Sequence, residues 1–175
     1  MSTVHPDLEG CSFALKTVLA TVSAADAHQS EGGKWSVAQV LEHLDLTYTK
    51  SAAGLVRRIQ KGPMPARSRT MWQIFARFVV VRLGHFPTGR RAPESVLPQG
   101  RPFSEIAPVL ERHLVELDER LSEAERLFGD KVPILDHPII GPFSVSDWRR
   151  FHLVHTRHHV KQLATRNQQL TTSAE

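Results

Sequence analysis

Four long stretches of this chain place apolar residues three or four positions apart, which is the spacing of one face of an α-helix. They cover approximately residues 7–28, 36–61, 104–127 and 144–168. Residues 129–142 read as a loop, and no two segments alternate apolar and polar residues as paired strands do. We therefore predict an all-α fold in which four long helices form a bundle.

Side chains that bond to free backbone groups mark where two of these helices begin. Ser36 is followed three residues later by Gln39, which makes a capping box in which each side chain bonds to the other residue's backbone N–H. Ser144 and Asp147 have the same spacing at the start of the fourth helix. Gly62, which a proline follows, is predicted to end the second helix.

A long connection rich in proline, glycine and arginine joins the second and third long helices, at about residues 63–102. Within it, residues 71–83 are predicted to form a short amphipathic helix. The connection is too short to have a hydrophobic core of its own. Residues 1–175 are therefore predicted to form a single domain with an insertion at about 63–102.

Positive charge is concentrated in and beside this connection. From Arg57 to Arg101 the chain carries ten Lys or Arg and one acid, Glu94, for a formal charge of +9. Since the whole chain carries +4, the remainder carries −5. Such asymmetry indicates either a surface that meets anions or a solvated basic face, and the sequence leaves both interpretations open.

Four aromatic residues are interleaved with these charges: Trp72, Phe75, Phe78 and Phe86. Basic and aromatic residues together can bind nucleic acid or a membrane surface. No recognised nucleic-acid motif accompanies them, so nucleic-acid binding is disfavoured. Packing over the end of the bundle, or a contact between two copies of the chain, is the favoured interpretation.

The composition also bears on the compartment. The chain has one cysteine, Cys11, so no disulfide can form within it, and we predict that Cys11 is a small buried hydrophobe. No apolar run approaches the length of a transmembrane helix, and the N-terminus lacks the basic stretch of a secretory signal. We therefore expect a cytoplasmic protein without a transmembrane segment.

Four of the ten histidines, His152, His155, His158 and His159, fall within eight residues of the fourth helix. At about 100° per residue, His155 and His159 lie about 40° apart, on the apolar face. His152 shares that face one turn earlier, and His158 is more marginal. Two imidazoles on successive turns can bind one ion, and neutral imidazole suits zinc, nickel, copper or iron. The motif lacks the glutamate of a zincin protease, which is therefore unsupported.

A third ligand from a facing helix would complete a metal site, and His43 of the second helix is the best candidate. It lies at the edge of that helix's apolar stripe. The neighbouring Glu42 and Asp45 point away from the stripe and are interpreted as solvated. On spacing alone, histidines that merely make ordinary hydrogen bonds remain a competing interpretation of the whole cluster.

Two segments of the chain resemble the DinB-like (DinB/YfiT) superfamily. The segment Lys34 to Leu44, KWSVAQVLEHL, is similar to the WS…EHL segment of that group, and His155 to Leu163, HTRHHVKQL, matches its closing HxxHHxxQ motif. The approach to the last helix, His137 to Ser144, resembles one poorly characterised branch of the group. The resemblance covers most of the chain in order, but the connection at 63–102 is not part of the common core.

The resemblance implies a left-handed four-helix bundle, commonly dimeric, in which one histidine of the second helix and two of the last bind a metal ion. The matching residues here are His43, His155 and His159. Relatives of this type include thiol-dependent transferases and isomerases that use glutathione, mycothiol or bacillithiol, together with members that have no known activity.

The leading hypothesis is therefore an enzyme that depends on a divalent metal ion such as zinc, nickel or iron, because three histidines leave a coordination position open. Such an ion can activate a low-molecular-weight thiol or a water, and the basic segment could bind an anionic small-molecule substrate. His152 or His158 could shuttle a proton, although a structural or supporting role is favoured for each. A non-enzymatic metal- or ligand-binding module is the alternative. The sequence does not identify the substrate, the metal or the catalytic groups.

Overall fold

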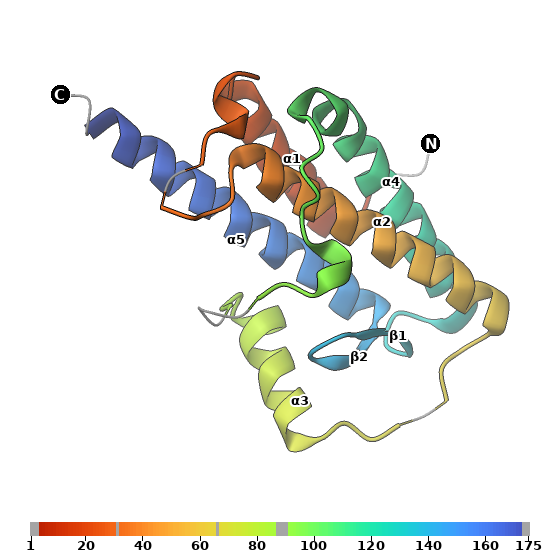
Figure 1. Cartoon of the computed structure of the whole chain (residues 1–175). Coiled ribbons are helices and arrows are strands. Elements are labelled where there is room, and N and C mark those ends of the chain that lie inside the picture. The colour runs from red at the N-terminus through yellow and green to blue at the C-terminus, as the bar shows by residue number, and fades with distance from the viewer. Residues whose placement is uncertain (1–3, 31, 66, 87–90, 173–175) are drawn as a thin grey trace.

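The computed structural model describes residues 4–30, 32–65, 67–86 and 91–172, with side chains of the last helix as far as residue 164. Within these residues the fold is mostly helical (Figure 1). The long helices are α1 Pro6–Thr21, α2 Val37–Lys61, α4 Phe103–Phe128 and α5 Val145–Thr172. The shorter elements are a 3-10 turn at Asp26–His28, α3 at Met71–Arg77, a π-helical stretch at Phe78–Arg82, a 3-10 turn at Glu94–Val96, and strands β1 Pro133–His137 and β2 Gly141–Ser144.

The four long helices pack in two pairs around one hydrophobic core. Helix α2 runs along α4, and α1 runs along α5. Most residues of the apolar stripes that the sequence predicted for the second and third helices are fully buried: Leu41, Leu44, Leu55, Ile106, Leu110, Leu114, Leu117 and Leu121. Cys11 is also buried in this core, as predicted. Side chains of α2 and α5 also meet, at Tyr48 with Thr156 and at His43 with His155.

The predicted helix starts are confirmed by their hydrogen bonds. Ser36 Oγ accepts from the Gln39 backbone N–H at 3.2 Å, and Gln39 Oε1 accepts from the Ser36 N–H at 2.8 Å. At the start of α5, Asp147 Oδ2 accepts from the Ser144 N–H at 3.2 Å. The short helix expected inside the connection is present as α3 and continues into the π-helical stretch.

The first helix is shorter than predicted. It ends at Thr21 instead of continuing to about residue 28, because Val22 has an extended backbone. The side chain of Ser23 then starts a separate 3-10 turn, since its Oγ accepts from the Asp26 N–H at 3.2 Å.

The prediction of a loop at residues 129–142, and with it of a strictly all-α fold, was wrong. Strands β1 and β2 form an antiparallel hairpin whose turn is residues 138–140, and β2 begins at Gly141, whose φ of +88° suits glycine. Ile134 and Phe143 point into the core and are fully buried. The two strands have only five and four residues, and each contains a proline. They therefore show too little alternation of apolar and polar residues to be recognised from the sequence.

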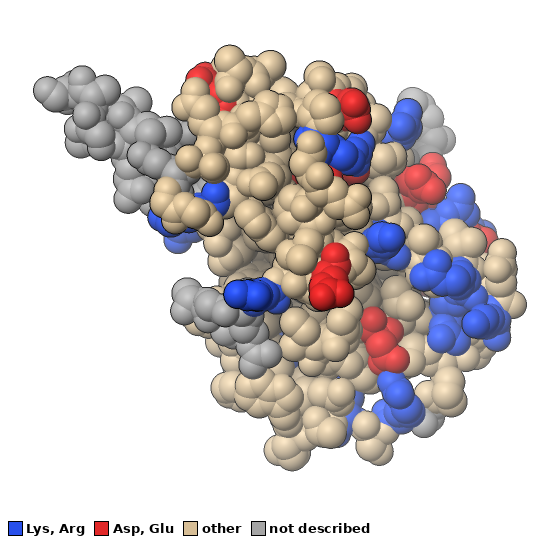
Figure 2. Space-filling view, in the orientation of Figure 1, with Lys and Arg blue, Asp and Glu red and all other residues tan. Residues whose placement is uncertain are grey.

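The basic connection is held against the bundle by ion pairs with acids outside it. Arg67 pairs with Asp136 at 2.8 Å, and Arg101 pairs with Asp45 at 2.7 Å. A third arginine of the connection, Arg77, pairs with a buried aspartate at the start of α5. Figure 2 shows basic residues gathered on one side of this face with acidic residues beside them. Part of the charge asymmetry therefore serves folding. Arg90 lies outside the described residues.

The interpretation of Glu42 and Asp45 as solvated was wrong. Both are buried, with 0% and 2% of their surface exposed. Glu42 Oε2 accepts from the backbone N–H groups of Gly100 and Arg101 at 2.9 and 3.1 Å. Asp45 accepts from Arg101 at 2.7 Å and meets His113 Nδ1 at 2.6 Å. The end of the connection crosses over this face of α2, which helix periodicity alone does not reveal.

In the part of the chain that the structure describes, no helix combines the length and apolarity needed to cross a membrane.

We expect Glu42→Ala to lower the free energy of unfolding by about 2 kcal/mol or more, because it removes two hydrogen bonds to a charged group and leaves two N–H donors without a partner. Chemical denaturation measures this. The matched control is Glu116→Ala, at an exposed position of α4, with an expected change within about 0.5 kcal/mol. Equal effects of the two substitutions would contradict the structural role of Glu42.

Candidate metal centre

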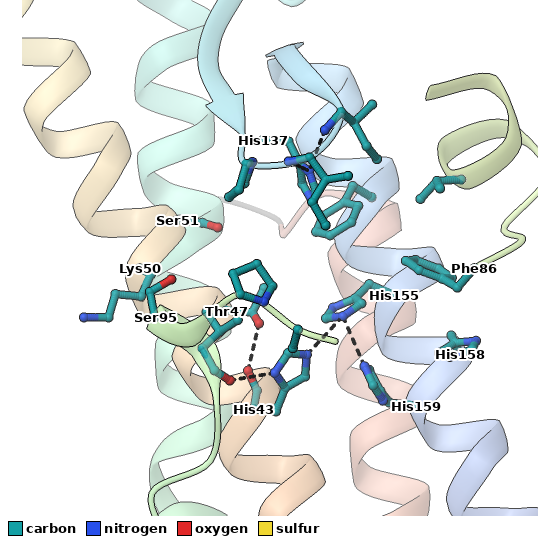
Figure 3. A pocket seen from close by; sticks show the side chains of 18 of the residues that line it. His43, Thr47, Lys50, Ser51, Phe86, Ser95, His137, His155, His158 and His159 are labelled. Atoms are coloured by element: carbon teal, nitrogen blue, oxygen red, sulfur yellow. Dashed lines mark hydrogen bonds between the residues drawn. The ribbon is translucent and has the colours of Figure 1, made fainter. Parts of the chain in front are cut away.

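Three histidines from two helices converge on one point. His155 and His159 lie on successive turns of α5, and His43 faces them from α2 (Figure 3). The Nε2 atom of His155 lies 3.3 Å from Nε2 of His43 and 3.1 Å from Nε2 of His159. One ring nitrogen of each residue lies within 4.8 Å of the others. The structure therefore brings together the three residues that the sequence singled out.

The separation of the nitrogens suits a metal ion. Two nitrogens bound at 2.0–2.1 Å to a tetrahedral zinc ion lie about 3.3 Å apart. The two Nε2 pairs above, at 3.3 and 3.1 Å, are close to that value. With all three ring nitrogens within 4.8 Å of one another, the group could hold one metal ion.

The hydrogen bonds on the other ring nitrogens favour the same arrangement. His43 Nδ1 donates to the Val96 carbonyl at 2.8 Å, which leaves its Nε2 with a lone pair. His159 Nδ1 lies 3.0 Å from Gln162 Oε1, which is an acceptor, so His159 Nδ1 carries the hydrogen and His159 Nε2 also keeps a lone pair. Since His155 Nε2 carries at most one hydrogen, at least two lone pairs point at one small space. Such a space can accommodate a cation.

Burial keeps two of these rings, His43 and His155, in the neutral form that binds metals. Desolvation lowers the pKa of His43, although its bond to the Val96 carbonyl opposes this. Desolvation, followed by the nearby His159 and His43, lowers the pKa of His155 well below its usual range. The His155 ring stacks on Phe151, with centroids 5.1 Å apart, and among the described residues its Nδ1 has no hydrogen-bond partner.

The three histidines line one side of a pocket of about 940 Å³ that opens between α2, α5 and the connection. Aromatic rings make up much of its wall, including Trp72, Phe75, Phe86, Trp148 and Phe151. Lys50, Arg57 and Arg91 also line it. Among the described residues the lining holds one acid, Asp136, which is paired with Arg67 at 2.8 Å. The size suits a small molecule, and the charges favour an anionic one.

The other two histidines of the cluster lie in different surroundings. His158 is half-buried, lines the pocket, and accepts from Gln162 Nε2 at 2.9 Å. His152 is fully buried and stacks on Trp148, and neither of its nitrogens has a partner among the described residues. It is absent from the lining of the pocket, and burial lowers its pKa to about 3. Neither histidine joins the group of three.

Three further residues of the site were not assigned a role from the sequence. Val96 belongs to the connection, 53 residues from His43, and no local pattern links the two. Gln162 appeared only as the glutamine of the resembling HxxHHxxQ motif, yet it bridges His158 and His159. His137 appeared only within the resembling segment, but it lines the same pocket. The proline and glycine that follow it, Pro138 and Gly141, were the one available indication, because they favour a turn.

The fold and the three converging histidines define a four-helix-bundle protein with a candidate metal centre. The chain belongs to the DUF1569 family, described as proteins of unknown function, which it matches over residues 12–166. It is similar to a solved structure described as "Crystal structure of TT2238, a four-helix bundle protein", with 21% sequence identity, a TM-score of 0.55, and 91% of this chain and 94% of that chain covered. At this identity the likeness shows the fold alone. A comparison with curated proteins finds no match.

We expect His152→Phe to make the metal-free protein less sensitive to acid. In the unfolded chain His152 takes up a proton below about pH 6.5. In the folded chain burial lowers its pKa to about 3, so it takes up the proton only near that pH. The unfolded state therefore binds more protons, and the wild type loses stability as pH falls through this window. Between pH 7.5 and 5.0 the variant should gain about 2 kcal/mol relative to wild type. Denaturant titrations at both pH values, with chelator present, measure this. Parallel pH profiles for the two proteins would contradict it.

Proposed function

We propose that His43, His155 and His159 bind one divalent metal ion, with zinc, nickel or iron as the candidates. The observation that carries the proposal is the convergence of three Nε2 atoms, two of which have lone pairs directed inward by hydrogen bonds to Val96 and Gln162. The resemblance of two segments to the DinB-like superfamily supports the same three ligands, and it is compatible with the four-helix-bundle likeness.

We further propose that the protein is a metal-dependent enzyme acting on a small anionic substrate. Three protein ligands leave a position open toward the pocket, as in catalytic zinc sites and unlike closed structural ones. A bound ion there would lower the pKa of a water or a low-molecular-weight thiol, and so supply a nucleophile at neutral pH. Lys50, Arg57 and Arg91 of the pocket wall would attract the substrate. A transferase, isomerase or hydrolase reaction would fit these parts.

A non-enzymatic metal- or ligand-binding module would use the same three histidines. The enzyme and the binding module differ in whether the ligand at the open coordination position exchanges with solvent. A metal-bound water or thiol that does not exchange would favour the module. Binding to nucleic acid or to a membrane surface has less support, because Arg67, Arg77 and Arg101 of the basic segment are engaged with acids of the same chain. The homodimer and the cytoplasmic location stay predictions.

The proposal predicts that metal content depends on His155 and not on His158. His155→Ala removes the ligand that lies between the other two, and it should lose the metal and the stability that the metal provides. That stability is about 2.7 kcal/mol when free metal is a hundred times Kd. Alanine favours helix, so α5 should persist. The measurement is elemental analysis of protein purified without a histidine tag, beside thermal melts with and without chelator.

The matched control is His158→Ala, which removes an imidazole from the same helix and the same pocket but from outside the group of three. It should keep most of the metal and still respond to chelator. His43→Ala should behave like His155→Ala, because the ligands come from both helices. Equal metal content in wild type and His155→Ala, with melts indifferent to chelator, would refute the metal centre.

A further inference from the structure

His137 lies at the other end of the pocket, where strand β1 ends. Its ring is packed among Phe143, Trp148 and Phe151, with centroid distances of 5.2, 5.9 and 4.7 Å. Figure 3 shows it at the hairpin end of the pocket, away from His43 and His159. The aromatic packing fixes the orientation of this ring.

The turn of the hairpin fixes which ring nitrogen carries the hydrogen. The backbone N–H groups of Ile139 and Ile140 both donate to His137 Nδ1, at 3.2 and 3.3 Å. A nitrogen that accepts hydrogen bonds cannot carry a hydrogen itself, so the neutral ring carries it on Nε2. Burial lowers the pKa of His137 to about 4, and the ring stays neutral near pH 7. His137 Nε2 is therefore a permanent hydrogen-bond donor.

A second donor is available nearby on α2. Ser51 lines the pocket and is 8% exposed. Helix α2 and strand β1 touch here, since a Cβ atom added to Gly54 would lie 2.8 Å from Leu135 Cδ2. Among the described residues, neither Ser51 Oγ nor His137 Nε2 has a hydrogen-bond partner, and neither belongs to the buried unsatisfied atoms. Both atoms are thus open to the pocket.

We propose that His137 Nε2–H and the Ser51 hydroxyl form a subsite that binds a carbonyl or carboxylate oxygen of the ligand. The proposal rests on the proposed function in one respect, namely that the ligand's other end reaches the three histidines. Because Phe86 and Phe151 line the pocket, the part of the ligand in between is apolar. The substrate class is therefore an acid, ester, amide or ketone with an apolar body.

The test uses hexanoate and hexanamide as probes, with hexylamine as the control that has no oxygen acceptor. Binding to the full chain is measured by calorimetry with chelator and again with zinc, and 15N NMR of the histidine side chains reports the tautomer. In wild type we expect His137 Nδ1 without hydrogen and an Nε2–H whose signal shifts with either acid or amide. A response to hexanoate alone would assign the subsite to carboxylates, and a response to both would assign it to any carbonyl oxygen.

Two variants of His137 separate its two nitrogens. His137→Asn keeps an acceptor near Nδ1 for the turn but removes the donor at Nε2, and it should weaken probe binding about tenfold or more. His137→Gln places an amide nitrogen near Nε2, and it should retain binding within about threefold. Ser51→Ala, which leaves the hairpin untouched, should weaken binding at least threefold and keeps the test decisive if the hairpin variants fold poorly.

The inference is overturned if wild type binds neither oxygen-bearing probe, or if His137→Asn and Ser51→Ala bind as well as wild type. It is also overturned if binding appears only with zinc, because the oxygen would then bind the ion. If the proposed metal centre is wrong, the results differ from these. His155→Ala would then have the same metal content as wild type, while probe binding in the presence of chelator would still depend on His137 and Ser51.

Discussion

The position of α2 relative to α5 depends on one buried hydrogen bond. Tyr48 of α2 and Thr156 of α5 are both fully buried, and their hydroxyl oxygens lie 2.6 Å apart. Sliding either helix would break this bond and leave the buried Tyr48 hydroxyl unpaired, at a cost of about 1–3 kcal/mol. Thr156 follows His155 directly, and Tyr48 lies little more than one turn beyond His43. The register that satisfies the hydroxyls is thus the register that brings the two histidines together.

The connection between α2 and α4 completes what the two helices begin. Its arginines bind acids of α2 and of the hairpin, such as Asp45 and Asp136, and this explains why a segment of formal charge +9 belongs to a chain whose remainder carries −5. Once docked, the connection supplies the Val96 carbonyl that orients His43. It also supplies Phe86, whose ring centroid lies 5.6 Å from that of His155. The insertion is therefore part of the site, although it lies outside the core that the resembling segments cover.

What the sequence predicted well depends on local spacing. The helix periods, the capping box at Ser36 and the one-turn step from His155 to His159 involve residues within a few positions of one another. What it missed depends on distant contacts. The burial of Glu42 follows from residues 58 positions away, and the acceptor for His43 comes from 53 positions away. The hairpin is a local element, but its strands are short, so its stability comes from packing against the bundle and not from a recognisable pattern.

The backbone sets the histidines at the two ends of the pocket in opposite chemical states. His43 Nδ1 donates to a carbonyl, so its Nε2 is left as an acceptor that a cation can share. His137 Nδ1 accepts from two N–H groups, so its Nε2 is left as a donor that an oxygen can share. Burial lowers the pKa of both rings, and protons therefore do not erase the difference near neutral pH. One residue type thus gives the pocket two unlike ends, and a ligand with an oxygen at one end and a metal-binding group at the other has only one orientation that satisfies both.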